Sequence, residues 1–390
     1  MAVKTVFFVL ALAVLSPFLY QRGQFALSFY TNAPSRLVKI NAFRSHSIKF
    51  ADRVRSCEDV LLLEDRGLAI LACDPGRERW NTVLGIFHPG PVTSAGLYAY
   101  EYKDAGTPDA EALKSIELAN FPAGQDFHTL GMAYDKATST LLVCNHAQAG
   151  SRLEMFKLDI AALTASHIRT IVHPLVHAPN AIALINSNEF YVTNDHLFPV
   201  RRSNILSKME TYLATPTGTI VHVELRGDAV QANVVARLAF ANGIEILNST
   251  TVAVSSTNQG VVYLYTKSSD ATLKYRSQFP VPFMPDNLSL SAGKLLIAGH
   301  PHLPTLLQFS RTRHICNDPA ELAKATAEMK EYCSNAEATS WVSEWSETGG
   351  LRHLYAGTEY PTSATAARDA KRGVGIVAGL YAKGIMVWRE

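Results

Sequence analysis

A loosely repeated unit of two short strands is the feature that most constrains how this chain can fold. From about residue 60 onward, runs rich in β-branched and aromatic residues alternate with tight turns, and long amphipathic helices are nearly absent. Four units open at Gly131, Asn180, Asn242 and Asp286, which are 49, 62 and 44 residues apart. A four-stranded propeller blade has about that length. A β-sandwich is the alternative, but it does not predict that successive units open with the same kind of residue.

The openings of these units predict a shared site. In a propeller the innermost strand of each blade lines the central channel, so the residues that begin these strands meet at one mouth of the channel. Carboxylate and amide oxygens are the ligands that calcium prefers. Asn and Asp are also ordinary turn residues, so a purely local role is the alternative. The oxygen donors at or near the openings are Glu58, Asp59, Asn180, Asn242, Asp286 and Asn287.

Seven motifs in a fixed order resemble those of the paraoxonase/arylesterase family. Within residues 57–302 they read CEDVLLLEDRGLAI, DFHTLGMAYD, LLVCNHA, PNAIALINSNEFYVTNDHLF, FANGIEIL, MPDNLSLS and AGHPH. Members of that family are six-bladed β-propellers with calcium in the central channel, so the resemblance implies an all-β, six-bladed propeller over residues 23–390. Gluconolactonase/regucalcin and strictosidine-synthase-like propellers share the architecture with fewer of these motifs. The resemblance further implies that the catalytic calcium is bound by Glu58, Asn180, Asn242, Asp286 and Asn287.

The chain departs from the family at two structural features. The family's second, structural calcium uses the acid that matches Asp59 together with an acid where this chain has Ala181. One carboxylate is therefore missing, and the resemblance leaves the second ion in doubt. The family disulfide that joins the chain ends also has no evident partner here, because the C-terminal sequence KGIMVWRE contains no cysteine.

A third departure concerns the histidines. In the family a histidine pair is proposed to activate water; the second member matches His146, but the first falls on Leu130, which cannot move a proton. His128 lies two residues earlier and would share a strand face with that position, although a satisfied polar role is the alternative. We expect His146 to be the general base, since an imidazole titrates near neutral pH. Further polar residues expected near the same mouth are His300, Asp195 and His196.

The N-terminus predicts entry into the secretory pathway. Lys4 precedes an apolar run from Val6 to Tyr20, which fits a hydrophobic helix that serves as a signal peptide or as an uncleaved membrane anchor over residues 1–22. A membrane or lipid surface is then a possible partner. Nucleic acid is excluded as an expected partner, because the net charge is only +2 and no basic block is interleaved with aromatic residues.

The cysteines and sequons agree with a secreted chain. The polar, helix-prone stretch 312–345 is predicted to be an insertion stapled by a Cys316–Cys333 disulfide, whereas Cys57, Cys73 and Cys144 are expected to be buried thiols. Asn287 and Asn248 both begin Asn-x-Ser/Thr sequons. We expect the sugar on Asn248, because Asn287 would face the channel.

These expectations favour a calcium-dependent hydrolase of lactones or aryl esters, in which water attacks a polarised carbonyl. One alternative is a non-catalytic propeller that keeps calcium only for stability and binds a partner through its loops. A second is a hydrolase of sugar lactones like the gluconolactonases. The apolar segments around Phe198 and after His300 favour lipophilic substrates over sugars.

Overall fold

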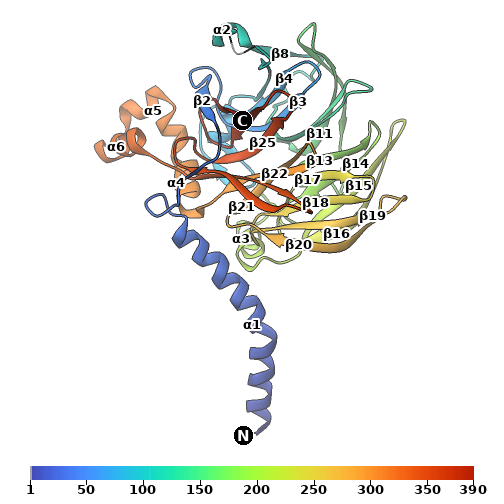
Figure 1. The fold of residues 1–390 in the computed structure, drawn as a ribbon, viewed down its shortest axis with the longest axis vertical. Helices are drawn as coiled ribbons and strands as arrows, with labels where there is room; N and C mark the ends of the chain where they lie inside the picture. The colour runs from blue at the N-terminus through green and yellow to red at the C-terminus, as the bar shows by residue number, and fades with distance from the viewer. Residues whose placement is uncertain (1, 105) are drawn as a thin grey trace.

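The computed structural model describes residues 2–104 and 106–390, and it describes side chains from residue 13 onward except at positions 14 and 105. Figure 1 shows a body of β-structure from which one long helix, α1 (Ala2–Thr31), extends. The predicted all-β class is confirmed, with a propeller-like arrangement of the sheets.

The sheets are built from successive antiparallel strands. The largest has eight strands, and its two halves are joined where β8 runs parallel to β12. In spatial order its strands are β3 (Cys57–Leu63), β4 (Leu68–Cys73), β7 (Gly96–Glu101), β8 (Leu113–Ala119), β12 (Thr164–Ile171), β11 (Gly150–Asp159), β10 (Thr140–Ala147) and β9 (Thr129–Asp135).

Two further sheets have four strands each. The first contains β13 (Pro179–Asn186), β14 (Glu189–Asn194), β15 (Gly218–Arg226) and β16 (Ala229–Leu238). The second contains β17 (Ala241–Asn248), β18 (Thr251–Ser256), β19 (Val261–Lys267) and β20 (Leu273–Pro280). A small hairpin is formed by β5 (Trp80–Asn81) and β6 (Ile86–Phe87).

The last two sheets each include a strand from the N-terminal part of the chain. One contains β21 (Met284–Ser291), β22 (Lys294–His300), β23 (Ser340–Ser346), β24 (Gly350–Gly357) and β1 (Ile40–Asn41). The other contains β25 (Ser363–Asp369), β26 (Val374–Gly379), β27 (Ile385–Arg389) and β2 (Ser45–Lys49). Hydrogen bonds between β2 and β27 thus join the two ends of the ring.

Six strands form the inner ring of the molecule. The first strand of each four-stranded unit contacts the first strand of the next, and the last of them contacts β3 again. These inner strands are β3, β9, β13, β17, β21 and β25. The residues that begin them are therefore brought to one channel, as the sequence predicts.

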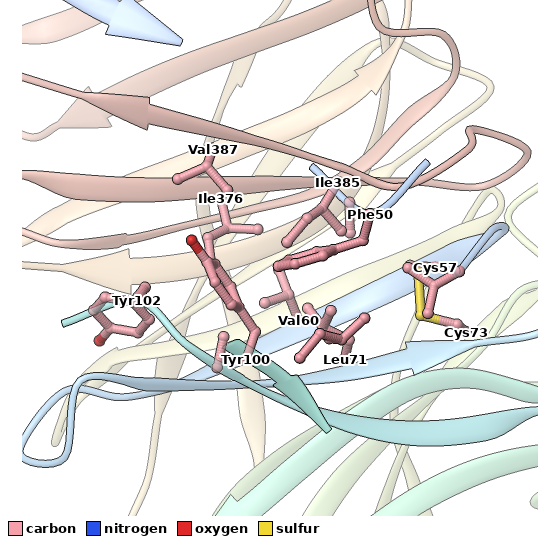
Figure 2. Close-up of a cluster of buried hydrophobic side chains, with 14 of the residues drawn as sticks. Phe50, Cys57, Val60, Leu71, Cys73, Tyr100, Tyr102, Ile376, Ile385 and Val387 are labelled. Atoms are coloured by element: carbon pink, nitrogen blue, oxygen red, sulfur yellow. A yellow bond between two sulfur atoms is a disulfide. The ribbon is translucent and has the colours of Figure 1, made fainter. Parts of the chain in front are cut away.

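A hydrophobic cluster packs the first sheet against the last one (Figure 2). Val60 of β3 and Leu71 of β4 lie against Ile376 and Ile385 of the last sheet, and Phe50 fills the space between them. All five side chains are buried. Because the burial of each large aliphatic or aromatic side chain contributes about 1.5–3 kcal/mol, this cluster stabilises the closure of the ring.

Two disulfides are present. Cys316 pairs with Cys333, as predicted. The expectation that Cys57 and Cys73 are free thiols is wrong, because they are directly opposite each other in β3 and β4 and form a second disulfide (Figure 2). Their apolar surroundings suggested buried thiols, but strand register brought the two sulfurs together. Cys144 is a buried free thiol, as expected.

The helical insertion lies partly outside its predicted bounds of 312–345. It begins earlier, and the run 305–311, which reads as a strand, is helical because His302 caps the helix and Pro304 occupies its first turn. It also ends earlier, since β23 already starts at Ser340. The helices of this insertion are α4 (Leu303–Cys316), α5 (Pro319–Lys324) and α6 (Ala327–Asn335). The other short helices are η1 (Pro75–Glu78), α2 (Asp109–Ala112) and α3 (Asn204–Leu213).

The N-terminal helix continues past the predicted boundary at residue 22. Its last turns contact the β-structure, since Arg22 donates to the Asn258 carbonyl and Phe25 lies beside Gly260. Residue 1 and the side chains of residues 2–12 and 14, on which the signal or anchor prediction depends, lie outside the described residues. Within the described part of the chain, no helix combines the length and apolar character needed to cross a membrane.

Candidate metal centre in the channel

The same position of four inner strands supplies residues to one cavity. Glu58, Leu130, Asn180 and Asn242 are each the second residue of their strand, and all four line this cavity together with Asp286 of β21. Irregular register beside these residues marks β-bulges in β3, β13, β17 and β21. Because a bulge redirects a side chain from the regular alternation, it explains how neighbouring strands aim polar groups into the channel.

Glycine follows two of these positions for a steric reason. A Cβ atom on Gly131 would lie 2.6 Å from the carbonyl oxygen of Asn180, and one on Gly243 would lie 2.6 Å from that of Asp286. Neighbouring inner strands therefore approach so closely at the site that only a residue without a side chain fits between them. This close approach brings the oxygen donors of successive strands within reach of one ligand.

The side chains at this end of the channel leave oxygens without partners. Glu58 Oε2 and the Oδ1 atoms of Asn180, Asn242 and Asn287 are buried, and each lacks a hydrogen-bond partner among the described residues. An unpartnered buried polar atom costs about 1–3 kcal/mol, so the three of them on cavity-lining residues call for a ligand. Asn287 lines the inner pocket with Asp59 and is linked to this site by its hydrogen bond to Glu58. The atoms are all acceptors, which indicates that the ligand is a cation or a donor of several hydrogen bonds.

The nitrogen ends of the three amides are held by the protein. Asn242 donates to Thr257 Oγ1 at 2.9 Å, and Asn287 donates to Glu58 Oε1 at 2.8 Å and to Thr365 Oγ1 at 2.9 Å. Asn180 donates to Asp195 Oδ2 at 3.4 Å. Each tether fixes the amide so that its oxygen is the end left free. This is the arrangement that supporting residues give to metal ligands.

The electrostatics of Glu58 also fit a cation. Burial raises the pKa of Glu58 well above its usual range, and the nearby carboxylates of Asp59 and Asp286 raise it further. A divalent cation between Glu58 and Asp286 would oppose all three effects. The donors are two carboxylates and three amides, all oxygen, at a site of hard-cation chemistry. No group of three or more His, Cys, Asp or Glu side chains placed for a metal occurs among the described residues, so any ion here depends on the amides.

Asp59, the next residue along β3, lies in a different setting. Its Oδ1 accepts hydrogen bonds from Val60 N and Thr365 Oγ1, and its Oδ2 accepts one from Met132 N at 2.6 Å. It lines the inner part of the channel with Ala181, beyond the cavity that Glu58 lines. Asp59 thus has its acceptor atoms occupied by the protein's own donors.

Two of the predicted histidines lie behind the cavity wall. His146 Nε2 donates to the Pro179 carbonyl at 2.6 Å, and Thr82 hydrogen-bonds its Nδ1. Burial lowers the pKa of His146. His128 is held between the carboxylates of Asp74 and Asp126. Neither histidine lines the cavity, so their predicted part in proton transfer stays a prediction.

His300 is the histidine that lines the cavity. Its Nε2 lies 2.9 Å from Asp286 Oδ2, and its Nδ1 is buried without a partner in the described part of the chain. Asp195 bonds His196 Nδ1 at 2.9 Å and also accepts a hydrogen bond from Asn180. Burial lowers the pKa of His196, but the hydrogen bond and charge of Asp195 outweigh burial and raise it overall.

Sequence reasoning missed part of the cavity entrance. The end of α1 contributes Phe25 and Phe29, which lie outside the repeated units, so no spacing in the sequence connects them with the channel. Leu303, Leu306 and Leu307 of α4 belong to the apolar run after His300 that the sequence assigns to the substrate site. The amphipathic pattern of α3 is the one local signal that could have been found.

A sequence profile of the arylesterase family matches residues 101–321. The chain belongs to the arylesterase family. It is 32% identical over 168 residues to mouse serum paraoxonase/arylesterase 1, a match that covers 42% of this chain and 46% of the relative. It is 28% identical over 232 residues to human serum paraoxonase/arylesterase 2, covering 56% and 62%. The chain thus spans about half the length of the curated arylesterases that it matches.

Among solved structures, a gluconolactonase from Xanthomonas campestris superposes with a TM-score of 0.50 over 90% of this chain and 93% of its own, at 12% identity. At that identity the likeness supports the fold alone. The suspected relationship to arylesterases, with gluconolactonase-like propellers as more distant structural relatives, is confirmed.

Proposed function

We propose that this protein is a calcium-dependent hydrolase of lactones or aryl esters. The observation that carries the proposal is the set of four buried oxygens without partners at the channel, in a chain of the arylesterase family. The six inner strands and their sheets would be the six blades of a closed propeller. Residues 23–390 would form that propeller, with the helices of the insertion covering one part of it.

Glu58, Asn180, Asn242, Asp286 and Asn287 would hold the calcium ion. A calcium ion there supplies Lewis-acid polarisation of the substrate carbonyl. The second ion is not part of the proposal, because the side chain of Ala181 offers no oxygen and both carboxylate oxygens of Asp59 already accept hydrogen bonds from the protein.

His300 is the group placed to accept a proton from the attacking water. Its Nε2–H is held by Asp286, so the unpartnered Nδ1 carries the lone pair beside the cavity. The water oxygen bonds to the carbonyl carbon, the acyl carbon–oxygen bond breaks, and the proton passes to the alcohol or phenol oxygen. His146 would act at a distance from this step, because it supports β13 through the Pro179 carbonyl.

The walls of the cavity favour lipophilic substrates over sugars. Apolar atoms form most of the surface of the cavity, and apolar side chains of α1 and α4 contribute to it. Leu130 adds another apolar group at the position where the family has a histidine. A sugar lactone would bury hydroxyl groups against these side chains at a cost of about 1–3 kcal/mol for each one left unpaired.

Association with a lipid surface and passage through the secretory pathway complete the proposal. On α1 the exposed apolar side chains include Leu15, Leu19 and Tyr20, which would contact the lipid. Asn248 is exposed at the end of β17 and would carry a glycan, whereas Asn287 is buried. Flotation with vesicles tests the first point, and a loss of glycan mass in Asn248→Gln tests the second.

The deciding experiment measures hydrolysis of a medium-chain lactone, phenyl acetate and gluconolactone, with calcium and with excess chelator. Wild-type protein should hydrolyse at least one of the first two, and chelator or Asp286→Ala should abolish the activity. Asp228→Ala changes a charged residue in a turn far from the channel and serves as the control. Calcium binding without turnover on any substrate would overturn the proposed function and favour a non-catalytic, calcium-stabilised binding propeller.

A further inference from the structure

Cationic side chains gather at the entrance of the cavity. The lining includes Arg22 of α1, Lys208 of α3 and Arg311 of α4, so three separate helices each contribute one positive charge. Deeper in the cavity lies Arg77, which is buried and has a free Nε. None of the four forms an ion pair with a carboxylate in the part of the chain that the structure describes.

The charges of the cavity do not balance. Four cationic side chains line it, against the two carboxylates of Glu58 and Asp286, so the formal excess is two positive charges. A bound divalent cation would increase that excess. The net charge of the whole chain is only +2, so the imbalance is a local property of the cavity. A concave site with an excess of one sign of charge attracts ligands of the opposite sign.

Arg22 shows how the protein presents one of these charges. It is half-buried, it donates to the carbonyl of Asn258 at 2.5 Å, and it lies over the ring of Phe25. Burial lowers the pKa of Arg22, because no carboxylate compensates for the lost hydration. Such a guanidinium is held in a fixed direction with donors to spare, which is the form in which Arg recognises carboxylates and phosphates.

Apolar side chains accompany the cations at the cavity entrance. Phe25 and Phe29 follow Arg22 on α1, and Leu303, Leu306 and Leu307 precede Arg311 on α4. A ligand that binds both the cations of the entrance and the oxygen donors of the channel has an apolar middle and an anionic end. Its reactive carbonyl would lie at the inner-strand ends.

We propose that the preferred substrates are anionic amphiphiles, namely esters or lactones that carry a carboxylate or phosphate at the end of an apolar segment remote from the carbonyl. Arg22, Lys208 and Arg311 bind that anionic group. The proposal rests on the hydrolase function proposed above and narrows its substrate class. Hydrolysis consumes one water and breaks the acyl carbon–oxygen bond, so a carboxylate substrate yields a dicarboxylate.

The test compares two substrates that differ only in charge, mono-4-nitrophenyl suberate and its methyl ester. Wild-type protein should show a kcat/KM for the free acid roughly tenfold higher than for the methyl ester at low ionic strength, with the preference decreasing in about 0.5 M salt. Lys208→Gln combined with Arg311→Gln changes two exposed side chains and should reduce the ratio at least about fivefold. The matched control combines Arg237→Gln with Lys274→Gln, an equal charge change on outer strands, and should leave the ratio unchanged.

Equal kcat/KM values for the two esters would overturn the proposal, and so would an equal change in the control. If neither ester is hydrolysed, the function proposed above fails, and calorimetric titration with suberate and dimethyl suberate decides the inference alone. Binding of suberate that depends on Lys208 and Arg311 would support it; binding of neither, or of both equally, would contradict it. If the double variant keeps the substrate preference but loses binding to anionic vesicles, the cations recognise a membrane and the inference is wrong.

Discussion

Glu58 has one carboxylate oxygen bonded to Asn287 and the other without a partner, whereas Asp59, the next residue, has both oxygens occupied. The two carboxylates line different parts of one channel, the mouth and the interior. Both are buried. The residue type and the burial of a carboxylate therefore do not distinguish a binding residue from a structural one. The number of hydrogen bonds that the carboxylate still lacks does distinguish them.

The largest effect should come from Glu58→Gln, which removes charge and keeps the shape of the side chain. Loss of a buried ionic partner costs about 3–5 kcal/mol, so calcium affinity should fall by about two orders of magnitude or more. Isothermal titration and the calcium-induced increase in Tm measure this loss. Glu117→Gln, an exposed change on β8, is the control. Undiminished affinity in Glu58→Gln would show that the mouth is not the metal site.

Asp59→Ala should weaken folding instead of binding. It leaves the N–H groups of Val60 and Met132 without their acceptor, whereas the hydroxyl of Thr365 keeps the Glu58 carbonyl. This predicts a loss of about 2–4 kcal/mol in the free energy of unfolding. Urea denaturation with and without calcium should give the same loss. A loss seen only in the presence of calcium would mean that the interior of the channel also holds an ion.

Ala181→Asp sharpens the comparison by adding a carboxylate beside Asp59. Wild-type protein should bind one calcium per chain, and the variant should bind two, because the new oxygen is not saturated by protein donors. Without calcium the variant should be less stable, since two buried like charges repel each other. Titration calorimetry counts the ions, and Ala181→Asn, which adds volume without charge, is the control. If the wild-type protein bound two calcium ions, the mouth and the interior of the channel would both be metal sites, and the proposed difference between them would be wrong.

The smallest effect should come from Thr257→Val, which removes the acceptor that holds the Asn242 amide. A lost hydrogen bond of about 1 kcal/mol predicts roughly fivefold weaker calcium binding. Thr257→Ser retains the hydroxyl and should restore most of the affinity. Equal affinities in all three proteins would show that the Asn242 oxygen is positioned by the backbone alone.

The sequence predicted the channel donors because each belongs to a repeated local pattern. Asn180 and Asn242 occupy the same position of successive units, and the all-β class follows from the short alternating strands around them. The exposed sequon at Asn248 and the buried one at Asn287 were also separated correctly by their places in those units. Features that recur in successive units can therefore be predicted from the sequence.

Features that depend on how segments distant in the sequence contact each other could not be predicted from the sequence. The disulfide between Cys57 and Cys73 depends on the register of two strands. The run 305–311 has a composition typical of a strand, but it is helical because His302 caps the helix. Likewise, nothing near His146 in the sequence indicates that Pro179 and Thr82 occupy both of its ring nitrogens. The cations of the cavity entrance come from three helices that share no pattern.

The pairing of β2 with β27 has a consequence for synthesis. Residues 45–49 leave the ribosome 340 residues before their partner segment at 385–389. This strand of the final sheet must therefore wait, with its edge unpaired, while the strands of the other sheets are translated. Closure of the ring should be the late and slow step of maturation, and exposed edges during that interval are where chaperones would act.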